Sequence, residues 1–366
     1  MLSIGIVGLP NVGKSTLFNA LVKNAQAEAS NYPFCTIDPN VGVVEVPDVR
    51  LGKLTEISKS QKTVPTTIEF IDIAGLVKGA HKGEGLGNQF LSHIKETDAI
   101  AMVIRFFENP DIIHVDGQIN PAEDIRTINL ELILADLTLA EKTLERMQKN
   151  LKPGDNETKK KILILEKIKA GLEEEMPIWA IFPNIEDLEP ICEFQFITSK
   201  PVLYIANVSE EMATIEPKEL IEKYHLGEII KNPDALIPIS AKIESELGEL
   251  NDADQKEFLE SLNLKESGLN RLISAAYVTL GLITFFTSGE KETRAWTVVK
   301  NSTAPQAAGK IHTDFERGFI AADVIKYNDF VEHQGWQNCK EKGLIKTEGK
   351  TYIAQDGDVM LFRFNV

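Results

Sequence analysis

The chain has 366 residues, 43% of them hydrophobic, and a formal net charge of −16. This length is typical of two or three domains with true hydrophobic cores, and the acidic charge argues against a broad electrostatic coating of nucleic acid. We expect no membrane span, because no apolar run approaches about 20 residues, and no signal peptide, since the chain enters a strand almost at once. The scattered cysteines, Cys35, Cys192 and Cys339, favour the cytoplasm over a disulfide framework or a zinc site.

The first predicted elements are a strand, a phosphate-binding loop and a helix. Ile4–Val7 is a short apolar run, Gly8–Thr16 has the pattern G-x-x-x-x-G-K-[ST], and Leu17–Lys23 carries apolar residues at helical spacing. In this setting backbone amides converge on phosphate oxygens, and the helix N-terminus adds positive potential. We expect Lys14 to reach the β and γ phosphates and Ser15 to ligate Mg²⁺.

A polar segment with two prolines follows, over residues 25–39. A nucleotide switch protein places its first mobile loop at this position after the phosphate loop. Thr36 is the candidate whose hydroxyl would hold Mg²⁺ and whose carbonyl would position the attacking water. A threonine that only caps a turn is the alternative.

Strands are predicted over Val41–Val46 and Thr66–Ile71, and the second ends in the D-x-x-G sequence of Asp72 to Gly75. Such an aspartate after an apolar strand is typical of a magnesium site, here through a water, and the Gly75 amide would sense the γ-phosphate.

Leu76 occupies the position where many GTPases have the glutamine that orients water, and its side chain cannot hydrogen-bond. Hydrolysis would then use another group, or the backbone and the metal alone. His81, in the glycine-rich loop that follows, is a candidate, with an exposed loop histidine as the alternative.

A long helix is predicted from Pro121, with leucines every seven residues at positions 130, 137, 144 and 151. Lys152–Asp155 breaks this pattern, and a second helix follows with Ile162, Leu165, Ile168 and Leu172 on one face. Two helices joined by a short Pro-Gly turn predict an antiparallel coiled-coil hairpin; a dimerising zipper is the alternative. The tip is basic, with seven lysines between residues 149 and 169 against three carboxylates. It would suit phosphate backbones, or be only the solvated flank of a coiled coil.

Two later strands, Pro201–Ala206 and Ala235–Ile239, lead into motifs that have base-binding counterparts in GTPases. Asn207-Val-Ser-Glu stands where GTPases have N-K-x-D, and Ser240-Ala-Lys matches S-A-K. The aspartate of N-K-x-D accepts hydrogen bonds from two guanine donors that adenine lacks. Glu210 is longer and cannot occupy the same point, so guanine loses its specific partner, while Asn207 can still bond a purine edge.

The last part of the chain, residues 281–366, is electrically neutral, with 11 basic and 11 acidic residues. Strands are predicted over residues 282–287, 295–299 and 358–364, with a short helix near His312. These elements predict a small α+β module that carries no catalytic constellation and therefore serves interactions.

Together these residues resemble the YchF/Obg-like ATPase family of P-loop proteins. The resemblance spans essentially the whole chain. It rests on the phosphate loop 8–16, D-I-A-G-L at 72–76, the glycine loop 78–87, N-V-S-E at 207–210, R-A-W-T at 294–297 and A-P-Q-A-A-G-K-I-H-T-D-F at 304–315.

The resemblance implies an α/β protein with three parts. A P-loop nucleotide-binding G domain would span residues 1–120 and 200–281, an inserted antiparallel coiled-coil hairpin 121–199, and a TGS domain of β-grasp type 282–366. It also implies a cytoplasmic, ATP-hydrolysing switch that prefers ATP to GTP. The expected partners are the ribosome, at its large subunit, and RNA, through the basic tip and the TGS domain, and we expect a monomer.

The family's functional positions carry over by motif. The phosphate-binding set is Asn11, Val12, Gly13, Lys14, Ser15 and Thr16; the Mg²⁺ set is Ser15, Thr36 and Asp72; the base-binding set is Asn207, Val208, Ser240, Ala241 and Lys242; and the catalytic set is Lys14, Thr36, Gly75 and His81. Asn11 also matches the position that binds K⁺ in cation-stimulated relatives. Leu76 matches the group with a hydrophobic residue in place of the glutamine.

Two other functions stay open on the sequence. If Glu210 reaches guanine, the protein is a GTPase of the same fold. If nucleotide is only a structural ligand, it is a ribosome- or RNA-binding module. The intact Lys14, Ser15, Thr36 and Asp72 favour a nucleotide-driven switch enzyme. The resemblance implies that it regulates translation or a stress response.

Overall fold

The computed structural model describes residues 2–28, 40–73, 86–108 and 119–365. They form two compact units, one built from residues 1–43 and 69–275 and the other from residues 44–68 and 276–366. No helix among the described residues is long and apolar enough to cross a membrane.

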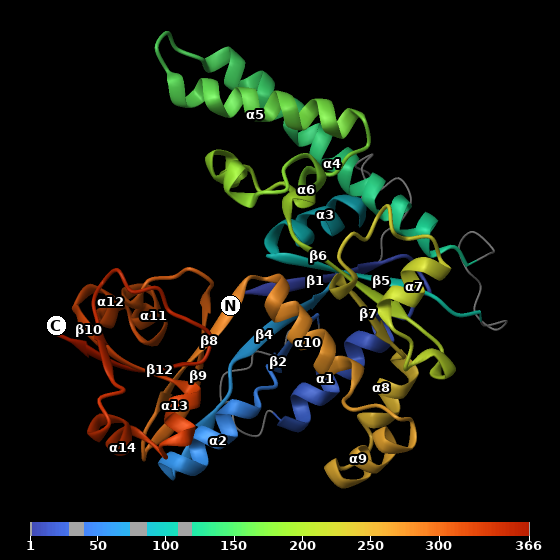
Figure 1. Ribbon diagram of the computed structural model, residues 1–366. Helices are drawn as coiled ribbons and strands as arrows, with labels where there is room; N and C mark the ends of the chain where they lie inside the picture. The colour runs from blue at the N-terminus through green and yellow to red at the C-terminus, as the bar shows by residue number, and fades with distance from the viewer. Residues whose placement is uncertain (1, 29–39, 74–85, 109–118, 366) are drawn as a thin grey trace. The chain divides into compact units, whose positions relative to one another are not determined.

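The first unit is built on a six-stranded sheet in the order β2 (Val41–Glu45), β4 (Thr67–Asp72), β1 (Ser3–Gly8), β5 (Ala99–Arg105), β6 (Val202–Asn207), β7 (Leu236–Ile239). The strands from β4 to β7 in this order pair in parallel. Every residue of β1 and β5 is buried, because helices cover both faces, as parallel sheets require. Figure 1 shows α3 (Leu86–Glu96) on one side of the sheet and α1 (Lys14–Glu28) and α10 (Gly268–Thr279) on the other. The carboxyl ends of β1, β4, β6 and β7 therefore meet at one edge.

Except for the last three, which follow β7, the helices of this unit lie in the connections between its strands. They are α1 (Lys14–Glu28), α3 (Leu86–Glu96), α4 (Pro121–Asn150), α5 (Asn156–Glu173), α6 (Ile178–Ile181), α7 (Pro217–Lys223), α8 (Ala241–Leu247), α9 (Asp252–Ser261) and α10 (Gly268–Thr279), with short 3₁₀ turns η3 (Ile185–Phe194), η4 (Ile197–Ser199), η5 (Glu210–Met212) and η6 (Pro233–Ala235). The last four residues of α10 belong to the second unit.

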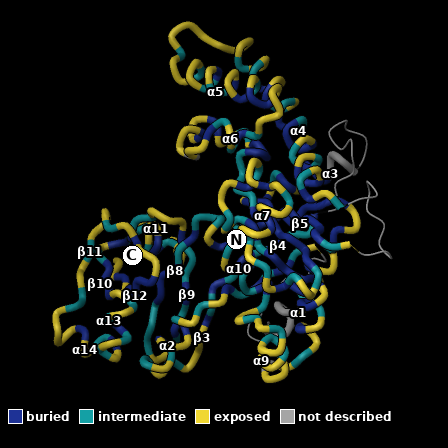
Figure 2. The backbone as a smooth tube through the Cα atoms, turned by 45° about the vertical axis from the view of Figure 1, so that its right-hand side comes forward, coloured by how far each residue is buried: buried dark blue, intermediate teal, exposed yellow. Residues whose placement is uncertain are grey.

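Helices α4 and α5 form a hairpin whose turn is exposed (Figure 2). Asn120 caps α4 by accepting from the Glu123 amide at 3.2 Å, and Asp155 caps α5 by accepting from the Thr158 amide at 3.0 Å. Such caps satisfy amides that have no partner within the helix. Residues next to each helix start therefore determine where α4 and α5 begin.

The core of the hairpin region is wider than the two-helix seam that the heptad pattern predicts. Residues from the segment after α5, including Ile178, Phe182 and Phe196, pack into the same cluster as Ile133, Ala140 and Leu165. The outer leucines, Leu130 and Leu151, are 37% and 36% exposed. The heptad prediction is therefore wrong at its two ends. Leu151 lies in the turn, and Leu130 lines a cavity described below.

A buried carboxylate fastens the end of this segment to α4. Asp136 is fully buried and accepts hydrogen bonds from the Ile197 amide at 2.9 Å and from the amide and hydroxyl of Thr198, both at 2.7 Å. Burial raises the pKa of Asp136 to about 6, although these donors oppose the shift. The contact fixes η4 immediately before strand β6.

The second unit contains another six-stranded sheet, in the order β11 (Lys346–Glu348), β10 (Phe319–Lys326), β12 (Asp358–Phe364), β8 (Leu282–Ser288), β9 (Glu292–Val299), β3 (Lys62–Val64). Its helices are α2 (Val49–Ser58), α11 (Ala304–Ile311), α12 (Thr313–Arg317), α13 (Tyr327–Glu332) and α14 (Trp336–Glu341). Adjacent strand residues point to opposite faces: Phe285 packs with α11, and Phe286 packs with α2 and α13. The sheet is thus covered on both sides.

Residues 44–68, which run from the end of β2 to the start of β4, belong to this second unit. Leu51 and Leu54 of α2 are buried in its core, and β3 pairs in parallel with β9. The sequence prediction kept these residues with the nucleotide-binding domain, because nothing in a ten-residue amphipathic helix tells which sheet it covers.

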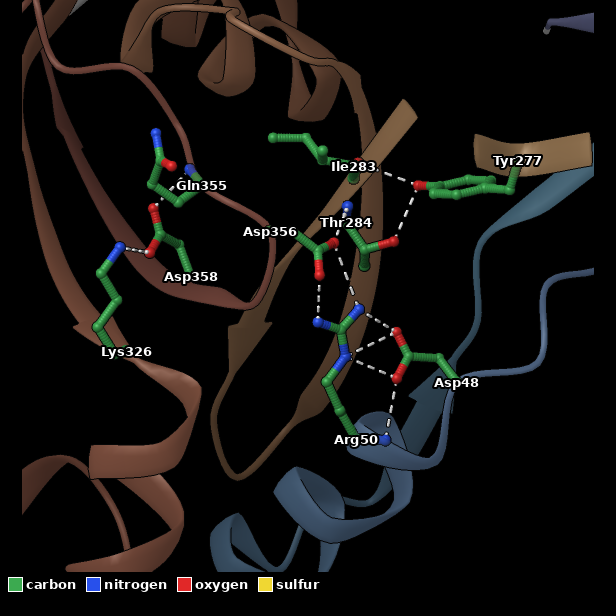
Figure 3. Close-up of polar contacts among 9 residues, drawn as sticks. All are labelled: Asp48, Arg50, Tyr277, Ile283, Thr284, Lys326, Gln355, Asp356 and Asp358. Atoms are coloured by element: carbon green, nitrogen blue, oxygen red, sulfur yellow. Dashed lines mark hydrogen bonds and ion pairs between the residues drawn. The ribbon is translucent and has the colours of Figure 1, made fainter. Parts of the chain in front are cut away.

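Arg50 of α2 anchors this segment through charge (Figure 3). Its guanidinium donates to both oxygens of Asp48 at 2.7–3.1 Å and to Asp356 at 2.6 Å, and it lies 5.1 Å from the centre of the Phe286 ring. Asp356 in turn accepts from the Thr284 amide at 2.9 Å. The hydrogen bond to Asp48 is the largest of the effects that raise the pKa of Arg50. Bidentate arginine–carboxylate geometry is stronger than a simple surface ion pair.

Candidate nucleotide-binding site

The loop between β1 and α1 has the backbone geometry that a phosphate site needs. Asn11 and Gly13 both have positive φ, 62° and 94°, so the chain turns sharply before α1 begins at Lys14. Glycine is required at position 13, because a Cβ there would lie 2.2 Å from Nδ2 of Asn207. The amide of Leu17 donates to the Gly13 carbonyl at 3.0 Å, which starts the helix. Ser15 and Thr16, in the first turn, are exposed.

The sheet brings Asp72 to this loop. Strand β4 runs parallel to β1 with Asp72 opposite Ile6, and the next amide, that of Ile73, donates to the Ile6 carbonyl at 3.2 Å. The Lys14 ammonium contacts the Asp72 carboxylate, and both side chains are largely buried, at 11% and 19% exposure. A lysine and an aspartate 58 residues apart thus form one charged pair at the carboxyl edge of the sheet.

Asn207 joins the phosphate loop to the S-A-K loop. It ends β6 and is 5% exposed. Its Nδ2 donates to the Val12 carbonyl at 2.8 Å, and its Oδ1 accepts from the Ala241 amide at 3.2 Å. A primary amide has two N–H donors and two acceptor lone pairs, so one of each is left for a ligand. The sequence predicted a base contact for Asn207, but it did not predict these two hydrogen bonds between the loops.

The remaining base-site candidates lie at the ends of β6 and β7. Val208 is 2% exposed and its amide donates to the Ile239 carbonyl at 2.9 Å, so its side chain packs into the domain and only its backbone is left for a base. Ser240 and Ala241 are also buried, at 4% and 6% exposure.

Glu210 and Lys242, both at this edge, form an ion pair. The Lys242 ammonium lies 2.6 Å from Oε1 of Glu210, with side-chain exposures of 68% and 44%. The hydrogen bond from Glu210 raises the pKa of Lys242. The carboxylate at the position of the guanine-binding aspartate is therefore held by a lysine of the neighbouring loop. Each motif was visible in the sequence, but their pairing follows from the adjacency of β6 and β7.

The helix that follows the D-x-x-G loop is held at its far end by Lys200. This ammonium donates to the carbonyls of Ile94 at 2.9 Å and Lys95 at 2.7 Å, and also to that of Thr97. Carbonyls at a helix C-terminus lack partners and attract cations. Burial lowers the pKa of Lys200 to about 8. No feature of the sequence pointed to this cap.

Three predicted catalytic residues, Thr36, Gly75 and His81, lie outside the described residues. Among the residues that are described, no group of three or more histidine, cysteine, aspartate or glutamate side chains could hold a metal ion. Mg²⁺ in nucleotide sites uses one or two protein oxygens together with phosphates. Ser15 and Asp72 supply oxygens of this kind beside the phosphate loop.

Two family models and several known proteins match this chain. Residues 3–167 match the family model described as a 50S ribosome-binding GTPase, and residues 282–365 match the model YchF-GTPase_C, described as a protein of unknown function. The chain is 55% identical over 367 residues to the ribosome-binding ATPase YchF of Pasteurella multocida, with 99% of each chain covered. It is 52% identical to the protein of that name from Bacillus subtilis, with 100% of each covered.

Among solved structures, the chain is similar to that of the Schizosaccharomyces pombe YchF GTPase, with a TM-score of 0.87 and 38% identity. The match covers 99% of this chain and 97% of that one. High identity over the full length and a shared fold lead to one conclusion: this chain belongs to the YchF family.

Proposed function

We propose that this protein is a Mg²⁺-dependent P-loop ATPase that binds the ribosome in the cytoplasm and regulates translation or a stress response. The observation that carries the proposal is the Lys14–Asp72 pair beside a positive-φ phosphate loop. The curated relatives are named ribosome-binding ATPases, which supports the same activity here.

In the proposed mechanism, backbone amides of residues 11–16 receive the phosphates, and Lys14 moves from Asp72 to the β and γ phosphates. Ser15, Thr36 and Asp72 would hold Mg²⁺, which would supply positive charge beside the phosphates. The Gly75 amide senses the γ-phosphate, and His81 is the candidate that positions water in place of Leu76. Asn11 is the proposed K⁺ ligand.

The preference for ATP over GTP is inferred from the Glu210–Lys242 pair. Guanine requires a carboxylate that accepts from its N1–H and 2-amino group, and buried base donors without partners cost affinity. Glu210 contacts Lys242 instead. The base would lie against Asn207, the Val208 backbone, Ser240, Ala241 and Lys242. A GTPase of the same fold is the second candidate if Glu210 leaves Lys242 for guanine.

The proposed ribosome-facing parts are the basic hairpin tip and the C-terminal domain. Three tip lysines, Lys149, Lys161 and Lys169, form ion pairs with neighbouring glutamates. By contrast, Lys152, Lys159 and Lys160 are exposed and have no ion pair among the described residues. These three are the best placed to meet phosphates of RNA in the large subunit.

The finer domain assignment is also part of the proposal. It comprises a G domain over residues 1–120 and 200–281, a coiled-coil insert over 121–199 and a β-grasp TGS domain over 282–366, in a monomeric protein. The second sheet and its helix α11 support a β-grasp-like module.

The decisive experiment is single-turnover hydrolysis of ATP and of GTP, with and without ribosomes. We expect slow hydrolysis of ATP alone, because Leu76 cannot position water, and faster hydrolysis with ribosomes. Tight ATP binding with no turnover in either condition would identify the nucleotide as a structural ligand. Equal or tighter binding of GTP would establish the GTPase alternative.

A further inference from the structure

A second cavity lies in the first unit, away from the phosphate loop. It has a volume of about 1010 Å³. Its walls are the first turns of α4, the segment around α6, the amino end of β6 and the loop that leads into β7 (Figure 1). The nucleotide site uses the opposite, carboxyl end of β6, where Asn207 lies. The volume is at the upper end of the roughly 300–1,000 Å³ typical of small-molecule sites.

The lining of this cavity is largely apolar and includes two aromatic side chains, Trp179 and Tyr204. Val202 and Tyr204 are two residues apart on β6 and point to the same face. Trp179 and Ile133 line the cavity from two other elements, and Leu130 and Met176 add apolar surface that is 37% and 39% exposed. Burying such surface against a ligand would be favourable, at about 25 cal/mol per Å².

The cavity also holds a polar group that can donate a hydrogen bond. Tyr204 lines the cavity and is 4% exposed, and its hydroxyl bonds to no group among the described residues, but this oxygen is not fully buried and water can reach it. In the free protein a water molecule can occupy this donor, and a ligand that reproduces the hydrogen bond can take the place of that water. Burial raises the pKa of Tyr204 to about 12, so the hydroxyl keeps its proton and remains a donor. A ligand with an acceptor atom could accept a hydrogen bond from this hydroxyl.

The charges around the cavity exclude anions. Four carboxylates line it, against two basic side chains, Arg126 and Lys231. Arg126 lies 3.7 Å from Glu123, and Lys231 lies 3.4 Å from Glu228, so both cations already face carboxylates. A second nucleotide or a phosphate would meet net negative charge here.

We propose that this cavity binds an uncharged, largely aromatic organic molecule that accepts a hydrogen bond from Tyr204. The apolar walls select an aromatic body, the Tyr204 hydroxyl selects an acceptor, and the carboxylates reject a negative charge. The site is independent of the proposed ATPase activity.

The test uses the full-length protein and Nile red, an uncharged aromatic dye with a carbonyl acceptor whose emission moves to longer wavelength when it accepts a hydrogen bond. We expect saturable binding of one dye molecule. Tyr204→Phe should weaken binding about threefold to tenfold, the worth of one neutral hydrogen bond, and shift the emission to shorter wavelength. Tyr224→Phe is the matched control, since that hydroxyl donates to the Phe106 carbonyl outside the cavity; it should change neither.

Two further arms test the shape and the charge of the site. Ala180→Trp, which fills the cavity, should abolish binding, while the anionic dye 8-anilinonaphthalene-1-sulfonate should not displace Nile red. Absence of saturable binding, equal binding and emission in Tyr204→Phe and the unmodified protein, or displacement by the anionic dye would overturn the proposal. Tyr204→Phe keeps the test decisive if Ala180→Trp fails to fold.

Discussion

Replacing Asn207 with alanine should detach the phosphate loop from the domain that holds it. The side-chain amide donates to the Val12 carbonyl at 2.8 Å and accepts from the Ala241 amide at 3.2 Å, at a site that is 5% exposed. Alanine removes both contacts and leaves two buried backbone groups unpaired. We therefore expect weaker binding of the phosphates, whatever base they carry.

The magnitude follows from the two contacts. Each neutral hydrogen bond contributes about 0.5–1.5 kcal/mol, and each buried group left unpaired costs about 1–3 kcal/mol. Because water enters part of the vacated space, we expect a loss of about 2–5 kcal/mol in the free energy of unfolding. If about 1.4–2.8 kcal/mol of this falls on the ordering of the loop, affinity for triphosphates drops about tenfold to a hundredfold.

A matched variant separates the two bonds. Ala241 is the first residue of α8, a position that accepts proline, and Ser240 before it has φ −95° and ψ 105°, which proline tolerates in a preceding residue. Ala241→Pro removes the amide that donates to Asn207 but keeps the bond to Val12. It should therefore retain most of the affinity for phosphates.

The assay is calorimetric titration with ATP, with GTP and with inorganic tripolyphosphate, which has no base. Asn207→Ala should weaken all three, and ATP somewhat more than tripolyphosphate because the base contact is lost as well. A loss confined to ATP, with tripolyphosphate bound as before, would show that Asn207 acts on the base and not on the loop. Thermal unfolding of the free proteins checks the predicted destabilisation.

Three further predictions concern catalysis, base choice and partners. Lys14→Ala or Ser15→Ala should abolish ATP hydrolysis in Mg²⁺ and weaken triphosphate binding at least tenfold, by loss of the phosphate cation or the metal ligand; near-normal turnover in both would refute the assignment. The double change of Val208→Lys and Glu210→Asp should raise GTP affinity relative to ATP in competition binding, and an unchanged ratio would remove Glu210 from base selection. Charge reversal of Lys159 and Lys160 should weaken ribosome co-sedimentation and flatten its salt dependence, whereas Lys149→Glu, which alters an already paired lysine, should matter less. A final prediction concerns pH. The pKa of Asp136 in the folded protein, about 6, lies above its ordinary value of 3.8, so the folded state holds this proton more tightly than the unfolded state does. The resulting stabilisation is fully present below pH 4, and about 3 kcal/mol of the free energy of unfolding is lost as the pH rises through 6. Urea unfolding between pH 4 and 7 should show this slope in the unmodified protein and lose it in Asp136→Asn.

The sequence alone determined the parts whose chemistry is local. The phosphate loop, its strand and its helix are contiguous, so the spacing of Gly8, Gly13 and Lys14 is enough to predict a phosphate site. The start and the break of the hairpin were likewise readable, because Asn120, Pro121 and Asp155 cap or begin helices through their own neighbours.

Only the tertiary structure decided which distant residues meet. The Asn207–Val12 bond spans 195 residues and depends on the order of strands in the first sheet. The docking of residues 44–68 on the second sheet depends on Arg50 reaching Asp356, 306 residues later. Likewise, only the fold brings Tyr204 of β6 to the same cavity as residues of α4 and α6. Hydrophobic periodicity shows that a face is buried, but it does not show which distant segment covers that face. The hydrophobic effect is non-directional, so packing of the whole fold decides the partner.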